Sequence, residues 1–534
     1  MTKSLSKAIA LATLVGVTAS AQAVSVNPEG LGEVLLYSLY TAEEGNITNI
    51  NITNTTNETK AVKVRFLEGQ NSHEVLDFNL YLSPHDQWTG AVTLGANGGA
   101  ELITADKSCT LPKIGLEKGV PFRDMEYLGD GGEQSIARTR VGHFEVIEMG
   151  DLNLGNKFKN ISNAIANKDC GVLEAAFEKG GLWHDDATEG FCGQVTGGLY
   201  GTAEIMNVNE STVISYDALA LEEFKVDGNL HVRPGTIYPN LNGNVVAPAP
   251  GETQSESLTS DFALIDGVQA KFPSTIQAIS ALLVKADIHN NYVIDEGRES
   301  KTNWVVTFPT KRFHVDASME NGLATVALSS YPAIKTAQTN VVNARNNLED
   351  KKKDGTPAQV LLAQQLLVAA EKVLASLIPL YSDLGVDQIA PFTKFWEAGT
   401  ACEDITISVW DNDERVKSNI DFSPSRPTGP QLCYETNIIT YNGGKVLGGE
   451  FVTQDIELDP ALFPYGWMNV DLVNYDTNPV RQRSIESLDR YVEVYGLPAI
   501  GFSAANFRNN SAKPGINNIY TSSSNHKATK STND

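Results

Sequence analysis

The sequence predicts a mainly β protein, built from several antiparallel β-sandwich modules of the immunoglobulin-like (Ig-like) type with short helices. Three observations point to this class. Apolar and polar residues alternate with period two through the stretch 46–93, as they do in strands that keep one face against a core. Clusters of turn-forming residues interrupt the alternation. The chain also contains 44 glycines, many of them in Asn-Gly, Asp-Gly and Gly-Gly pairs that favour tight turns.

The clearest alternation lies between residues 60 and 68. Val62, Val64 and Phe66 alternate there with Lys63 and Arg65. Successive side chains of a strand point to opposite faces of the sheet, so we expect the apolar set in a core and the charged set in water. A second segment repeats this pattern, with Leu76, Phe78, Leu80 and Leu82 against Asp77, Asn79 and Tyr81.

Further strands and short helices follow along the chain. Residues 34–40 form a continuous apolar run, which predicts a strand in a core. Strand-like segments recur farther on, and two helix-like segments flank Cys170. The predicted strands are 140–149, 302–308, 405–409, 434–441, 467–473 and 491–495, and the predicted helices are 157–166 and 172–179.

One segment breaks the β pattern and predicts an inserted antiparallel helical hairpin over residues 334–382. In its first helix the apolar residues recur at helical spacing, through Ala337, Val341, Ala344 and Leu348. We expect the hairpin to be either a self-packed insertion or a projecting element that contacts a neighbouring molecule.

The second helix of this hairpin is predicted from its capping signals. Thr356 and Gln359 form a capping box, with Pro357 at the first helical position. Its predicted buried stripe is Leu362, Leu366, Ala369, Val373 and Leu377.

The first residues read as a secretory signal peptide. Lys3 and Lys7 precede the short apolar run 8–17, and Ala21-Gln22-Ala23 is a cleavage site. We therefore expect an exported protein of the cell surface or extracellular space, with a mature chain beginning at Val24. No later stretch is expected to span a membrane.

Length and composition predict several domains, because 534 residues exceed one ordinary core. The polar C-terminal residues are expected to be disordered. The predicted division is 1–23 signal peptide, 24–105 N-terminal sandwich, 106–315 second β-rich region that either stands apart or completes the first sandwich, 316–520 C-terminal β domain with the hairpin, and 521–534 disordered tail.

The formal net charge of −24 disfavours nucleic-acid binding, because phosphate backbones are repelled. It suits the binding of divalent cations instead, and Asp- and Asn-rich loops supply the oxygen ligands that calcium prefers. A polar turn is the competing interpretation of such loops. The calcium candidates are Asp287, Asp295 and Glu296 in one loop and Asp411, Asp413 and Glu414 in another.

Five cysteines follow the cleavage site. Export implies oxidising conditions, so disulfides are expected. Short spacing favours the pairs Cys170–Cys192 and Cys402–Cys433 and leaves Cys109 unpaired, although spacing alone does not fix connectivity.

The search for catalytic residues gives three weak matches. Ser503 lies in a Gly-Phe-Ser-Ala-Ala stretch that lacks the closing glycine of a nucleophile elbow. His184 stands beside Asp185 in a glycine-rich loop, and His73-Glu74 lacks the second histidine of a zinc protease. We therefore expect no enzyme activity and no cofactor other than calcium.

Five strings share a resemblance to a known family. The chain resembles abundant secreted surface proteins of marine Gram-negative bacteria, of the surface-layer (S-layer) type. The resemblance covers most of the mature chain and implies assembly of copies into a lattice on the outer membrane, in contact with components such as lipopolysaccharide, and it carries over no active-site residue. The strings are Val62-Lys-Val-Arg-Phe-Leu-Glu-Gly69, Val75-Leu-Asp-Phe-Asn-Leu-Tyr-Leu-Ser-Pro84, Asn303-Trp-Val-Val-Thr-Phe-Pro-Thr-Lys-Arg312, Ser408-Val-Trp-Asp-Asn-Asp-Glu414 and Gly496-Leu-Pro-Ala-Ile-Gly-Phe502.

Three hypotheses of function follow. The first is a non-enzymatic structural protein whose copies form an S-layer-type lattice. The second is a secreted adhesin or glycan-binding protein, which predicts exposed aromatic residues in a cleft, with Trp88, Trp183 and Trp396 as candidates. The third is a secreted hydrolase, which requires a convergent acid–base pair.

Overall fold

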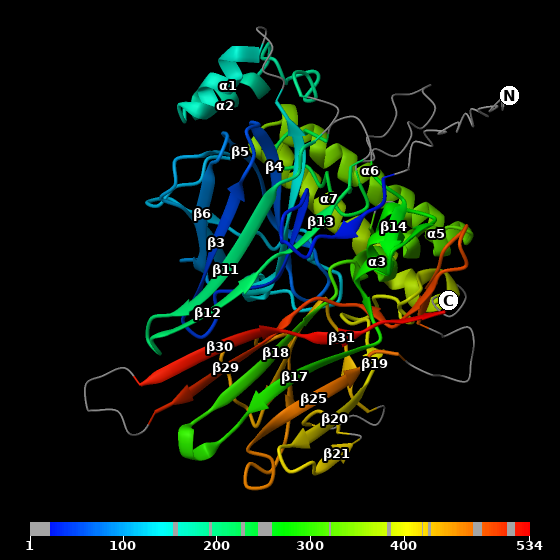
Figure 1. Cartoon of the computed structure of the whole chain (residues 1–534). Coiled ribbons are helices and arrows are strands. Elements are labelled where there is room, and N and C mark those ends of the chain that lie inside the picture. The colour runs from blue at the N-terminus through cyan, green and yellow to red at the C-terminus, as the bar shows by residue number, and fades with distance from the viewer. Residues whose placement is uncertain are drawn as a thin grey trace, which may run out of the picture.

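The computed structural model describes residues 22–152, 158–191, 195–225, 230–243, 259–319, 322–381, 386–418, 420–424, 429–473, 483–509 and 518–533. Within these residues the chain is mainly β and forms several antiparallel sheets, as predicted. Two stacked β regions make up the body, with long helices along one side (Figure 1). The predicted signal peptide lies outside the described residues except at its last two positions.

Two facing sheets form the first β-sandwich and enclose one core. The phenyl and phenol rings of this core pack closely, with Tyr37 stacked on Phe144 at 4.0 Å and Phe66 at 4.9 Å from Phe144. One sheet contains, in order, β1 (Ser25–Val26), β13 (Leu219–Glu222), β2 (Val34–Thr41), β10 (Val141–Asp151), β4 (Lys60–Glu68), β5 (Glu74–Leu82) and β8 (Cys109–Leu111). The other contains β12 (Thr212–Asp217), β11 (Leu199–Asn207), β3 (Asn46–Asn54), β6 (Gln87–Leu94), β7 (Ala100–Ile103) and β9 (Val120–Pro121).

These sheets mix strands from two predicted regions. β2 to β7 come from residues before 105, and β10 and β11 come from residues after it. β10 pairs with both β2 and β4 at the centre of its sheet. The first sandwich is therefore completed by strands far along the chain.

The polar face of β4 and β5 is buried, which corrects the expectation that it faces water. Lys63 and Arg65 are 0% and 4% exposed. Lys63 pairs with Asp77, and Arg65 pairs with Glu74 at 2.7 Å. The segment 230–243 contacts the Lys63–Asp77 pair, since Gly235 N donates to Asp77 at 2.9 Å. The alternation is confirmed, but both faces of this sheet are covered.

Two five-stranded sheets form the second sandwich and enclose a second core. Strand β18 (Lys301–Thr307) contributes side chains to both cores. Trp304 and Val306 point into the second core, and Val305 points into the first. The outer sheet is β21 (Val416–Ser418), β20 (Thr406–Asp411), β25 (Tyr465–Asp471), β17 (Asp287–Val293) and β31 (Lys527–Thr529). The inner sheet is β24 (Thr453–Ile456), β23 (Thr436–Tyr441), β18 (Lys301–Thr307), β29 (Phe502–Arg508) and β30 (Ile519–Asn525).

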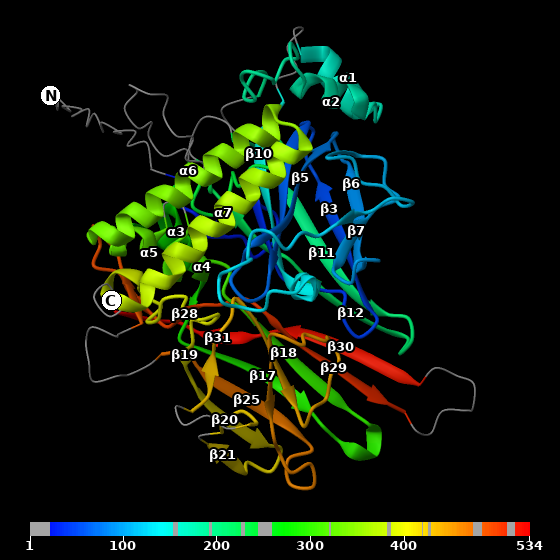
Figure 2. The ribbon, with the colours of Figure 1, turned by 180° about the vertical axis from the view of Figure 1, so that it is seen from behind.

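The two sandwiches are packed against each other. Tyr216 of β12 stacks on Phe502 of β29 at 4.7 Å, and Thr307 donates to the carbonyl of Ser38 at 2.7 Å. β12 and β30 lie side by side in both views (Figures 1 and 2). Hydroxyl groups of β30 donate to carbonyls of β12, among them Thr521 to Val213 at 2.5 Å.

The C-terminal residues are ordered strands, so the prediction of a disordered tail over 521–534 is wrong. β30 pairs with β29, β31 pairs with β17, and β32 (Ser531–Asn533) pairs with β27 (Glu493–Tyr495). His526, between β30 and β31, donates from Nε2 to the carbonyl of Val305 at 2.8 Å. The polar composition resembled disorder because the backbone, rather than apolar side chains, makes most of these contacts.

Small sheets and helices connect the sandwiches. The small sheets pair β14 (Phe262–Ile265) with β15 (Val268–Lys271), β16 (Val284–Lys285) with β28 (Leu497–Pro498), β19 (Glu403–Asp404) with β22 (Gln431–Leu432), and β26 (Ser484–Glu486) with β27. The helices are α1 (Lys159–Ala166), α2 (Cys170–Phe177), α3 (Thr275–Leu283), α4 (Lys311–Val315), α5 (Leu323–Leu328), α6 (Pro332–Asp354) and α7 (Pro357–Leu377), with 3₁₀ turns at Ile136–Arg140, Glu296–Arg298, Ile378–Leu380 and Val386–Ile389.

α6 and α7 run side by side across one side of the molecule (Figure 2). Only Gly355 and Thr356 connect them, and the predicted capping box of Thr356 and Gln359 is present. The segment Pro357–Leu380 is long and apolar enough to cross a bilayer, which corrects the expectation that no later stretch has this property. Length and composition alone are weak support for a span, because packed helices of soluble proteins also meet this criterion.

Candidate functional site

Asp411, Asp413 and Glu414 occupy the tight turn between β20 and β21. The Arg415 guanidinium lies in the same turn, 2.7 Å from Asp411 and 3.3 Å from Asp413. The second oxygen of Asp411 accepts the backbone N–H groups of Asp413 and Arg415 at 2.9 and 2.8 Å. Two of the three carboxylates therefore already have a cationic partner within one copy.

The other calcium candidates are not brought together. Asp287 begins β17, whereas Asp295 and Glu296 follow its far end, so the two places lie roughly 20 Å apart at the usual rise of a strand. Asp287 pairs with His289 at 2.7 Å, and Asp295 accepts the N–H of Gly297 at 2.8 Å. In the described part of the chain, no three His, Cys, Asp or Glu side chains are grouped to hold a metal. Calcium binding stays a prediction.

One predicted disulfide is confirmed and the other is wrong. Cys402 is bonded to Cys433, as expected. Cys170 is bonded to Cys109, 61 residues earlier, and not to Cys192, which lies outside the described residues. β8 carries Cys109 at the edge of its sheet, and the start of α2 packs there. Spacing along the chain missed this pair because the partners meet only in the folded sandwich.

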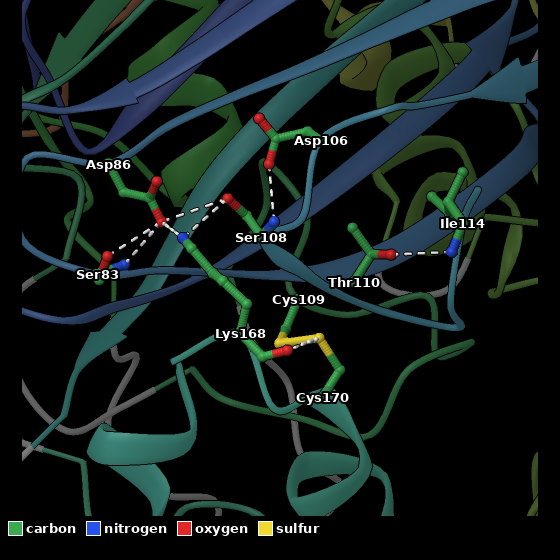
Figure 3. Close-up of a disulfide and its surroundings, with 9 residues drawn as sticks. All are labelled: Ser83, Asp86, Asp106, Ser108, Cys109, Thr110, Ile114, Lys168 and Cys170. Atoms are coloured by element: carbon green, nitrogen blue, oxygen red, sulfur yellow. Dashed lines mark hydrogen bonds and ion pairs between the residues drawn. A yellow bond between two sulfur atoms is a disulfide. The ribbon is translucent and has the colours of Figure 1, made fainter. Parts of the chain in front are cut away.

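Polar contacts support the Cys109–Cys170 disulfide (Figure 3). The Lys168 ammonium, two residues before Cys170, pairs with Asp86 and donates to Ser108 at 3.1 Å. Closing a loop of this length stabilises the fold by about 4 kcal/mol through the unfolded chain. The disulfide therefore fastens α1 and α2 to the first sandwich.

The three catalytic candidates lie in separate places. The Ser503 hydroxyl donates to the carbonyl of Asn291 at 3.2 Å, so it faces backbone and not a base. His184 pairs with the exposed Asp185 at 2.7 Å. His73 is buried 3.4 Å from Asp130 within a cluster of ion pairs. These side chains thus make local structural contacts.

The tryptophans named for a glycan-binding cleft are buried, so that prediction of exposed residues is wrong. Trp88, Trp183 and Trp396 are 0%, 1% and 5% exposed. Trp410 and Trp467 are the pair that reaches the surface, stacked at 4.0 Å across β20 and β25. Their positions at 410 and 467 alternate with the core residues Val409 and Met468, and this alternation is the sequence signal that could have identified them.

An apolar surface is exposed on α7. Leu362, Leu366 and Val373 are 57%, 51% and 54% exposed, and Leu380 just beyond the helix is also exposed. Leu362, Leu366, Ala369 and Val373 recur every three or four positions and therefore share one face of the helix. We call them the α7 stripe. The prediction that this face is buried is wrong, since the buried residues are Ala363, Leu367, Glu371 and Leu374.

A buried contact between Arg345 and Glu371 joins α7 to α6. The Arg345 guanidinium of α6 lies 3.5 Å from Glu371 of α7, and both side chains are about 8% exposed. Burial raises the pKa of Glu371 to about 8, against the opposing effect of Arg345. The predicted stripe of α6 is confirmed, with Ala337, Val341 and Leu348 buried.

Sequence spacing did not distinguish the two faces of α7, because the helix is apolar on nearly all sides. Ala363, Leu367 and Leu374 have the same helical spacing as Leu362, Leu366 and Val373. Burial of Glu371 against Arg345 selects the first set for the interior. The second set then faces outward, which an ordinary surface helix avoids.

Comparison with known proteins gives no relative. No protein-family model, curated protein or solved structure matches this chain.

Proposed function

We propose that this chain is an exported, non-enzymatic structural protein of the cell surface, whose copies associate side by side into an S-layer-type lattice. The exposed α7 stripe carries the proposal. In this view the chain consists of Ig-like sandwiches with α6 and α7 as an inserted antiparallel hairpin, and the stripe is a contact between copies. The resemblance to secreted surface proteins supports the same reading.

Charge favours association through α7. The chain has a formal net charge of −24, so most approaches of two copies are opposed by like-charge repulsion. Glu371 and Lys372 are the charged residues between 357 and 380, and Glu371 is buried. Two α7 faces therefore meet with little electrostatic opposition while removing leucine side chains from water.

The size of the surface suits a lattice better than a soluble dimer. A helix of 21 residues is about 30 Å long and about 10 Å wide, so two stripes bury roughly 600 Å² in total. Stable interfaces bury about 1,200–2,000 Å². Copies should thus stay apart when dilute and associate when held together at high local concentration.

The test replaces apolar groups of the stripe with polar groups of similar size. We expect the variant Leu362→Gln/Leu366→Gln to form no ordered arrays under conditions where the unsubstituted mature protein does, by light scattering and negative-stain imaging. The matched control is Leu94→Gln/Leu116→Gln, which changes two equally exposed leucines away from α7.

Two outcomes would contradict the proposal. If both variants assemble like the unsubstituted protein, α7 is not the contact. If the unsubstituted protein stays monomeric at high concentration and on outer-membrane material, the lattice is wrong. The adhesin or glycan-binding hypothesis then stands first, with Trp410 and Trp467 as the residues to examine.

A further inference from the structure

A cavity of about 840 Å³ opens between the two sandwiches. The segment 27–31 and strands β2, β11, β12 and β13 line it on one side. Lys285 of β16, the segment 499–501 and residues Asn525, His526 and Ala528 line it on the other. Its size is that of a pocket for a small organic molecule.

The floor of the cavity is apolar. Leu36, Ala218, Ala220 and Ile500 lie there with little exposure. Leu36 belongs to β2 and Ala220 to β13, Ala218 connects β12 to β13, and Ile500 precedes β29. The floor therefore offers apolar contact to a ligand body but no charge.

Lys285 introduces a charge into this cavity. It belongs to β16, is half-buried, and lines the wall. Among the described residues its ammonium group forms no hydrogen bond or ion pair. The charges that act on it are Lys530 and Asp266, which pair with each other at 3.3 Å. Lys285 is thus an uncompensated cation in a partly desolvated place, which costs free energy until an anion meets it.

The other ionisable groups of the lining limit the ligand. Glu29 and Asp217 are exposed lining residues, and they would repel a molecule with several negative charges. His526 is neutral, because burial lowers its pKa to about 4 and its Nε2 donates to a carbonyl. Among the described lining residues Lys285 is therefore the one cation available to a ligand.

We propose that this cavity binds a small amphipathic organic anion, whose single acidic group pairs with Lys285 and whose apolar body lies on Leu36 and Ile500. The site is separate from the α7 stripe and does not depend on lattice assembly. Burial lowers the pKa of Lys285 to about 8, so the ammonium form prevails at pH 7 and is lost by pH 9.5. Asp266, Lys530, Glu29, Asp217 and His526 are the titratable groups around it.

The probe is 1-anilinonaphthalene-8-sulfonate, an amphipathic anion that fluoresces when bound and stays charged from pH 6 to 10. Binding is measured in the Leu362→Gln/Leu366→Gln background, so that the α7 stripe does not bind it. We expect one site per chain, weakened about tenfold by Lys285→Met and also about tenfold between pH 7 and pH 9.5, as the ammonium is lost. Lys417→Met, at an exposed lysine of β21, should leave affinity unchanged.

Lys285→Arg distinguishes a charge effect from damage to the fold. Arginine stays protonated throughout this range, so the variant should bind at pH 7 and lose the decline at pH 9.5. Equal affinity in Lys285→Met and the unsubstituted protein would overturn the proposal. So would the same pH profile in the unsubstituted protein and Lys285→Arg.

Discussion

At the scale of single residues, the main departure from the predicted alternation is that charged side chains of the strands are buried. The Lys60 ammonium lies 2.5 Å from Glu148 and 2.9 Å from Asp151, with almost no exposure. Arg138 holds Glu68 at 2.6 Å and Asp130 at 2.8 Å. Removing one partner of such a pair leaves an uncompensated buried charge, which is costly. These pairs join β4 to β10 within one sheet and hold the 3₁₀ turn Ile136–Arg140 against β4.

Glu371 gives a prediction at this scale. Its pKa is raised to about 8 in the folded protein, against 4.5 ordinarily, so folding favours the protonated form. The contribution of the Glu371 carboxyl to the free energy of unfolding is therefore fully present below about pH 4.5 and is lost as the pH rises through 8. Glu371→Gln cannot ionise, so its stability relative to the unsubstituted protein should grow by about 1.4 kcal/mol per pH unit between pH 5 and 8.

Urea unfolding at pH 5, 6.5, 8 and 9 measures this difference. The control is Glu178→Gln, at an exposed glutamate, whose effect should stay nearly constant. A Glu371→Gln difference that does not change with pH would show that the buried pair is ionised throughout.

At the scale of elements, the last strands close three sheets. β30 protects the edge of β29 with seven paired residues, and the His526 ring packs on Trp304 at 4.8 Å. Without them, β29 becomes an open edge and the carbonyl of Val305 loses its donor. Open edges invite aggregation, and an unpaired buried carbonyl is costly.

We therefore expect removal of residues 518–534 to lower the melting midpoint by at least about 3 °C, the loss of about 3 kcal/mol in a protein of this size. Removal of 531–534 alone should have a much smaller effect, because it takes away only the three-residue β32. Differential scanning calorimetry compares the two. Identical melting of the long truncation and the full chain would show that these strands add no stability.

At the scale of the whole molecule, charge governs association. Loss of the expected signal peptide removes Lys3 and Lys7, so the mature charge is 39 − 65 = −26. Monovalent salt screens such repulsion only beyond about 8–10 Å. Within one copy the single charge of Arg415 offsets only one of the two carboxylates that it contacts, Asp411 and Asp413. We propose that a bridging cation binds the remaining carboxylate charge of two copies.

The expected result is assembly of the mature protein on addition of millimolar calcium or magnesium, and dispersal in chelator. Asp411→Asn/Asp413→Asn/Glu414→Gln should raise the calcium concentration at half-maximal light scattering several-fold. Arrays that form equally well in chelator would remove cations from the proposal but leave the α7 contact in place.

The alternation of Val62, Val64 and Phe66 with charged neighbours was sufficient to predict β4 and which side chains share a face, because side-chain direction in a strand depends only on the local backbone. It did not predict that the charged face is buried, since that depends on ion pairs with residues distant in sequence. Thr356 and Gln359 likewise identified the start of α7, since a cap involves neighbours along the chain. Local sequence patterns of this kind did not predict the candidate site. Which face of α7 is buried depends on Arg345, and the partner of Cys170 depends on how α2 meets β8. Such choices compare contacts between segments distant in sequence, so only the packed tertiary structure decided them.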